Sequence, residues 1–222
     1  MNPDDRPDNG HQQADTLAAD TLAATRRSWH GVAELVMAGP QFRSSDSIEL
    51  RVAPGGFRTV AEPALRVDGA VLVAGAARLP LTGLTYAGLA DAAGVQACDL
   101  ADVYRDGSGL SPGDPVDADP AIAGYLATCF ASGDAALRML APGREPVLWP
   151  EHFDVAVDLD EITYGVSLGD TQIAGPYAYV APWTKRAGQF WNASFGAAQS
   201  LGEQPAPAAI AEFFQAGRSA AG

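Results

Sequence analysis

Four residues that can hold or transfer a proton lie close together after Trp149. Glu151, His152, Asp154 and Asp158 fall within eight consecutive positions, in the run Trp-Pro-Glu-His-Phe-Asp and the segment that follows it. Alternate side chains of an extended strand share one face, which predicts that His152 and Asp154 point the same way. An imidazole oriented by a carboxylate can act as a general base. The candidate catalytic residues are therefore His152, Asp154 and Glu151.

Two other interpretations of these residues stay open. With His30 as a third ligand, the imidazole and carboxylates can bind a divalent metal ion. A histidine that follows a proline at the start of a strand can instead be structural, with its ring nitrogens bonded to the backbone. Our interpretation includes no metal site, and the sequence does not show whether His30 approaches His152.

Aromatic residues are concentrated around the same run. Half of the chain's Trp, Tyr and Phe residues lie between positions 149 and 195. Large rings in irregular segments more often line a groove than fill the interior of a sheet, although the rings can also form core. A cluster of rings with a few polar groups is typical of a small-molecule pocket. The predicted ligand-binding residues are Trp149, Tyr177, Tyr179, Trp183, Trp191 and Asn192.

Two glycine motifs do not fit the chemistry they suggest. The segment from Gly165 to Gly169 matches Gly-x-Ser-x-Gly, but no helical pattern follows it, and the catalytic histidine of that motif must come later in the chain, whereas the last histidine is His152. Gly107-x-Gly109 lacks the third glycine of a dinucleotide fingerprint. The first motif indicates a turn, and the cofactor, if there is one, stays unknown.

The charge of the chain argues against polyanionic partners. Its 27 acidic and 14 basic residues give a net charge of −13, which opposes binding to nucleic acid or anionic lipid. No apolar run is long enough to span a bilayer, and residues 1–20 lack the pattern of a signal peptide. We therefore expect a cytoplasmic protein with free thiols at Cys98 and Cys129, and with neither nucleic-acid nor membrane partners.

The periodicity of the chain predicts an α+β fold in which antiparallel β-hairpins pack with three or four helices. Residues 1–14 are predicted to be a disordered acidic tail, and 15–222 a single domain of two similar-sized halves, with a possible sub-division near 105–120. Apolar residues at helical spacing predict a first helix from Asp15 to the Gly39-Pro40 pair. Further helices are predicted over 85–95, 121–140 and 208–218, hairpins over 47–80 and 153–166, and a strand over 177–180.

Four segments carry a resemblance to other proteins. They are the run from Leu148 to Asp154, the later Tyr-Gly-Val-Ser run, the segment Pro-Tyr-Ala-Tyr-Val-Ala-Pro-Trp, and Phe190-Trp191-Asn192-Ala193. Together they resemble a group of actinobacterial proteins of unassigned function, over the region from Ser28 to Leu201. The resemblance implies a bacterial, cytosolic origin and transfers no catalytic residue.

The sequence leaves three functions open. The first is binding of a small, partly apolar ligand in an aromatic-lined pocket near the Trp-Pro-Glu-His-Phe-Asp run. The second is an enzyme that uses His152 as a general base on a small metabolite. The third is a structural or interaction module without a ligand, in which two copies form a homodimer through the C-terminal helix.

Overall fold

The computed structural model describes residues 9–222, which contain one antiparallel sheet of ten strands. The strands are β1 (Leu50–Ala53), β2 (Gly56–Thr59), β3 (Leu65–Asp68), β4 (Val71–Ala74), β5 (Ala77–Pro80), β6 (Val147–Trp149), β7 (Asp154–Leu159), β8 (Ile162–Ser167), β9 (Tyr177–Pro182) and β10 (Ala197–Ser200). Their order across the sheet is β10-β9-β8-β7-β6-β1-β2-β3-β4-β5. The predicted α+β class with antiparallel hairpins is confirmed.

Short turns connect most neighbouring strands, so strands adjacent in the chain are also adjacent in the sheet. Gly69 joins β3 to β4 at a φ of 60°, and Asp160 and Glu161 join β7 to β8 with φ values of 54° and 60°. Positive φ at such positions matches the right-handed twist of a two-residue hairpin. The halves β1–β5 and β6–β10 meet where Leu50 of β1 lies opposite Leu148 of β6. One sheet therefore runs through both halves.

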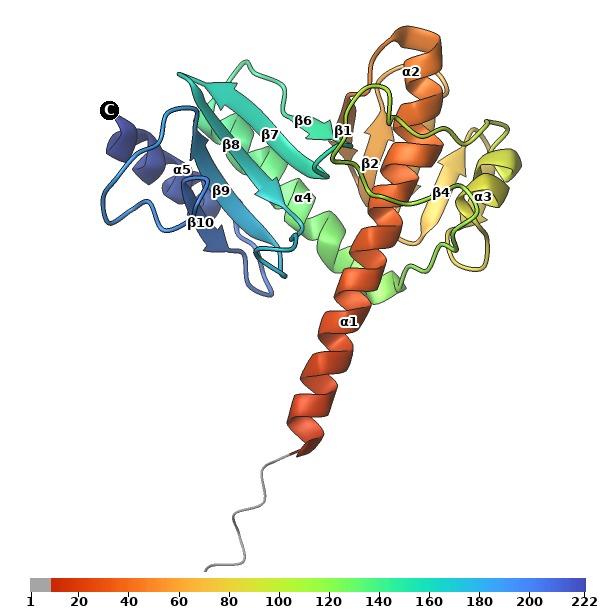
Figure 1. Ribbon diagram of the computed structural model, residues 1–222, viewed down its shortest axis with the longest axis horizontal. Coiled ribbons are helices and arrows are strands. Elements are labelled where there is room, and N and C mark those ends of the chain that lie inside the picture. The colour runs from red at the N-terminus through yellow and green to blue at the C-terminus, as the bar shows by residue number, and fades with distance from the viewer. Residues whose placement is uncertain (1–8) are drawn as a thin grey trace, which may run out of the picture.

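The described residues form four separate helical stretches. They are α1 (Asn9–Gly31) continued by η1 (Val32–Ala38) and α2 (Gly39–Ser45), then α3 (Tyr86–Ala92), α4 (Pro120–Leu140) and α5 (Pro207–Ala221). The segment η1 has π-helical hydrogen bonding, and all seven of its residues are buried. In Figure 1, α4 passes behind β7 and β8. The stretch that contains α1 contacts α4 and packs on the same face of β2, since Trp29 and Phe130 both meet the ring of Phe57.

The predicted bounds of the first helix were wrong at both ends. Helical structure continues through Gly39 and Pro40, because Pro40 lies in the first turn of α2, where a backbone N–H is not required. The stretch ends instead at Asp46, which has a left-handed φ of 55°. At the other end, α1 begins at Asn9 rather than Asp15. Of the predicted acidic tail, residues 1–8 lie outside the described residues.

Helix α4 covers one face of the sheet and leaves the other face of β7–β9 for a site. Its N-terminus is capped by Asp119, whose carboxylate accepts hydrogen bonds from the backbone N–H groups of Ala121 and Ile122. Gly133 allows close packing on β8, because a Cβ atom there would lie 2.8 Å from the side chain of Val166. Among the described residues no helix is both long and apolar enough to cross a membrane.

Candidate functional site

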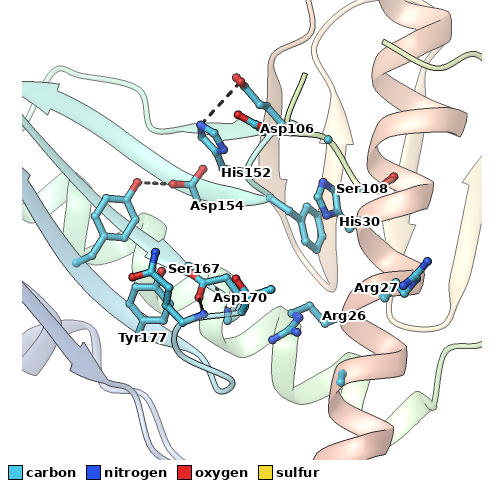
Figure 2. A pocket seen from close by; sticks show the side chains of 18 of the residues that line it. Arg26, Arg27, His30, Asp106, Ser108, His152, Asp154, Ser167, Asp170 and Tyr177 are labelled. Atoms are coloured by element: carbon cyan, nitrogen blue, oxygen red, sulfur yellow. Dashed lines mark hydrogen bonds and ion pairs between the residues drawn. The ribbon is translucent and has the colours of Figure 1, made fainter. Parts of the chain in front are cut away.

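A pocket of about 970 Å³ lies between α1 and the open face of β7, β8 and β9. The side chains that line it come from α1, from the loop at 106–108, from the turn before β7 and from the three strands (Figure 2). Those used below are Arg26, Arg27, His30, Asp106, Gly107, Ser108, Glu151, His152, Phe153, Asp154, Ser167, Asp170, Tyr177, Tyr179 and Phe195. The pocket therefore joins a helix near the N-terminus to the C-terminal half of the sheet.

The strand register brings polar side chains together on the sheet wall. Asp154 lies opposite Ser167, and Ser167 lies opposite Tyr177, so these three side chains form a row across β7, β8 and β9. The next row on the same face places Gly165 opposite Tyr179. A Cβ atom at Gly165 would lie 2.6 Å from the Tyr179 ring, so glycine is needed for that ring to lie across β8. The Tyr179 hydroxyl thereby reaches β7 and donates a hydrogen bond to Oδ2 of Asp154.

Asp154 is a buried carboxyl group with one satisfied oxygen. Its exposed fraction is 6%, and Oδ1 has no hydrogen-bond partner among the described residues. Burial raises the pKa of Asp154 above its ordinary value of 3.8, while the hydrogen bond from Tyr179 and the nearby His152 act in the opposite direction. Burial and the neighbouring Asp154 raise the pKa of Tyr179 as well, so the phenol keeps its proton.

His30 of α1 forms part of the opposite wall. Its Nε2 lies 2.7 Å from the backbone oxygen of Pro150, and its ring stacks on Phe153 with centroids 5.1 Å apart. Burial lowers the pKa of His30 below 6.5, so the ring is neutral at pH 7. A carbonyl oxygen can only accept a hydrogen bond, so Nε2 carries the proton and Nδ1 is left as an acceptor.

The loop at 106–108 is held against η1 by a buried glutamate. Oε2 of Glu34 accepts a hydrogen bond from the backbone N–H of Ser108 at 2.8 Å. A Cβ atom on Gly107 would lie 2.2 Å from Oε1 of Glu34, so the absence of a side chain there permits the approach. Single π-helical turns often occur at functional sites, and this one fixes a loop at the edge of the pocket.

A second set of polar contacts braces the far end of the pocket. Asp170 accepts hydrogen bonds from the Tyr177 hydroxyl and from the backbone N–H groups of Gln172 and Ile173. Arg26 donates to the backbone oxygen of Ala174 at 2.7 Å and interacts electrostatically with Asp170. Because Arg26 and Asp170 already have partners, this end of the pocket is electrostatically balanced.

Five of the nine predicted site residues line the pocket, and four lie outside it. Those inside are Glu151, His152, Asp154, Tyr177 and Tyr179. Of the others, Trp149 lies in β6, and Trp183 is 66% exposed. Trp191 packs edge to face on Phe190, and Asn192 bonds to the backbone of Ala198.

The predicted pairing of His152 with Asp154 is not formed. The side chain of His152 is 62% exposed, and its Nε2 lies 3.9 Å from Oε1 of Glu151, whereas Asp154 is bonded to Tyr179. The prediction assumed an extended chain, but β7 begins only at Asp154, and Phe153 before it has a left-handed φ of 51°. The two-residue period therefore does not apply to His152.

The α1 residues were the part of the site that sequence reasoning missed. The sequence suggests His30 only as a metal ligand. It gives no reason to select Arg26 and Arg27 of α1, or Asp170 after β8, as site residues. In the described part of the chain, no group of three or more His, Cys, Asp or Glu side chains is placed to hold a metal ion. A spacing of 120 residues between His30 and Pro150 gives no local signal that could have identified the contact.

The two histidines are expected to respond differently to replacement by alanine. His30→Ala should lower the free energy of unfolding by about 1–3 kcal/mol, because the Pro150 carbonyl loses its donor. His152→Ala should change it by less than about 0.5 kcal/mol, since that side chain is mostly exposed. Urea denaturation of both variants measures the difference. An equal loss of stability in the two variants would contradict these assignments.

No family model, curated protein or solved structure matches this chain. The functional argument therefore depends on the geometry of the pocket.

Proposed function

We propose that this protein binds a small, partly apolar molecule in the pocket between α1 and β7–β9. The observation that carries the proposal is the unpartnered Oδ1 of Asp154, in a side chain that is 94% buried and lines the pocket. A buried polar atom without a partner costs about 1–3 kcal/mol. An unsatisfied buried group that lines a pocket requires an explanation, and a ligand that donates a hydrogen bond to Oδ1 would remove the cost.

The remainder of the wall supports the same proposal. Rings of Phe153, Tyr177, Tyr179 and Phe195 supply apolar area, and the polar groups are few and fixed by contacts behind them. The volume of about 970 Å³ lies within the usual range for small-molecule sites. A cavity that contains both His152 and acidic oxygens favours a ligand-binding or catalytic role over an interaction module without a ligand.

General acid/base catalysis is the second candidate function. Burial raises the pKa of Asp154 and lowers the pKa of His30, so the same pocket holds a carboxyl group and an imidazole whose charged forms are both disfavoured by burial. Titratable groups with shifted pKa values in one pocket are typical of catalytic acids and bases. In this second candidate function the general base is His30, whereas the sequence had suggested His152.

Asp154→Asn separates stability from binding and therefore tests the proposal. The folded pKa of Asp154 lies above its unfolded value, so the ionised carboxylate destabilises the folded state increasingly as the pH rises through the folded pKa. At pH 7 the unliganded variant is expected to be more stable than the wild type by about 1 kcal/mol. Below pH 3.8 the carboxyl is protonated in both states, and the difference should disappear.

The ligand arm uses a thermal-shift screen of metabolites against both proteins at pH 7. At least one compound is expected to raise the melting temperature of the wild type, by an amount that grows with occupancy, and to leave Asp154→Asn unchanged. A library in which no compound shifts the wild type would contradict the proposal, as would compounds that shift both proteins equally.

A further inference from the structure

We infer that the ligand is an organic cation, with an ammonium group beside Asp154 and an apolar body against the aromatic rings; this inference rests on the proposed binding function. It concerns the acidic end of the pocket, which we define as Asp106, Glu151 and Asp154. Figure 2 shows Asp106, His152 and Asp154 at this end. His152 and Glu151 both interact electrostatically with Asp154.

The acidic end contains none of the lysine or arginine side chains that line the pocket. The arginines that line the pocket, Arg26 and Arg27, both belong to α1, and Arg26 is engaged by Ala174 and Asp170. The charged groups with the largest effect on Asp154 are His152 and Glu151, and the side chain of His152 is mostly exposed to solvent. A buried carboxylate is stable only when a positive charge or several hydrogen bonds compensate for lost hydration, and Asp154 has one hydrogen bond.

An ammonium group supplies what Asp154 lacks. It carries a positive charge and three N–H donors, so it can bond to Oδ1 while Tyr179 keeps its bond to Oδ2. A neutral hydroxyl group would donate to Oδ1 without offsetting the charge. A ligand carboxylate would add a further negative charge next to Asp106, Glu151 and Asp154. The protein's net charge of −13 also favours the approach of cations.

The pocket offers the ligand both a route to Asp154 and an apolar surface for its hydrocarbon part. His152 lies at the acidic end beside Asp154 (Figure 2). Its exposed side chain makes a 3.9 Å contact with Glu151, so it can turn aside and let a ligand reach Asp154. Tyr177 stacks on Phe195 with centroids 6.1 Å apart, and both rings line the pocket. Aromatic faces attract organic cations as well as hydrocarbon.

Three probes with the same phenylethyl body and head groups of different charge test the inference: 2-phenylethylamine, 2-phenylethanol and 3-phenylpropionate. Each is titrated into the full chain at pH 7.5 and low salt, with isothermal calorimetry or NMR shifts as the measurement. The amine is expected to bind in the millimolar range or tighter, and the alcohol and the acid at least about tenfold more weakly. Asp154→Asn should weaken amine binding by at least about tenfold.

Asp158→Asn is the matched control. Asp158 lies on the same face of β7, two positions beyond Ala156, but its side chain is exposed and bonded to Thr163, so its replacement changes the net charge equally. It should leave amine binding within about twofold of the wild type, because Asp158 does not line the pocket and its carboxylate is exposed to solvent.

The outcomes separate the cation inference from the binding proposal. Equal affinity for the amine and the alcohol, preference for the acid, or amine binding that Asp154→Asn leaves intact would overturn the cation inference. If a neutral or anionic compound from the screen then depends on Asp154, the binding proposal stands alone. If neither probes nor library compounds bind, both are overturned.

Discussion

Replacing Trp29 by alanine is expected to lower the free energy of unfolding by about 3–5 kcal/mol. Trp29 is fully buried, meets Phe57 edge to face with centroids 5.4 Å apart, and donates from Nε1 to the backbone oxygen of Gly69 at 3.2 Å. Its loss leaves a large cavity and an unsatisfied carbonyl where α1 packs on β2 and the β3–β4 turn. Urea denaturation followed by circular dichroism measures the effect.

Trp183→Ala is the control for this prediction. Trp183 is 66% exposed, so its replacement should change the free energy of unfolding by less than about 0.5 kcal/mol. A similar loss in both variants would show that α1 is not anchored through Trp29. Because His30 follows Trp29 directly, the same variant should also loosen the α1 wall of the pocket and weaken ligand binding.

Gly165→Val is expected to lower the free energy of unfolding by about 2–5 kcal/mol and to abolish ligand binding. The new Cβ atom would lie 2.6 Å from the Tyr179 ring, which must move away from β8. Asp154 then loses its only hydrogen bond while it stays buried. Overpacking and the unsatisfied carboxyl both contribute to the expected loss.

Two further variants give this prediction its controls. Gly175→Val introduces the same side chain where no atom lies within 4 Å of a new Cβ, and stability should change by less than about 0.5 kcal/mol. Tyr179→Phe removes the hydroxyl but keeps the ring, so it should reproduce the loss of binding without the steric cost. Gly165→Val that binds as well as wild type would exclude a role for the Tyr179–Asp154 pair.

The hairpins and the long central helix could be predicted from the sequence because their signals are local. Gly69 and the Asp160-Glu161 pair turn the chain through positive φ angles that the local sequence favours. Helix α4 has a capping Asp119 followed by Pro120, and apolar residues at helical spacing. The short strands β6 and β10 were missed, since three or four residues carry too little periodicity to distinguish a strand from a loop.

Part of the pocket was also foreseeable. Asp154, Tyr177 and Tyr179 lie in β7 and β9 of the antiparallel sheet. Short connections place strands that follow one another in the chain side by side in this sheet, so these residues come close together. The sequence could not show that Gly165 leaves room for the Tyr179 ring, because that contact depends on the register between β8 and β9. It could not show that Trp183 faces solvent, since a ring's surroundings depend on which elements cover it.

The sequence by itself determined the fold class, the hairpin turns and the segment that carries the acidic end of the pocket, because these depend on interactions between residues near one another in the chain. Only the tertiary structure placed His30 and Arg26 across from that segment, by packing α1 against α4 and β2 at the edge of the pocket. It also left Asp154 buried with one carboxylate oxygen unpartnered. Burial and pairing depend on all the elements around a side chain, and residues as far apart in the chain as His30 and Pro150 meet only in the folded structure.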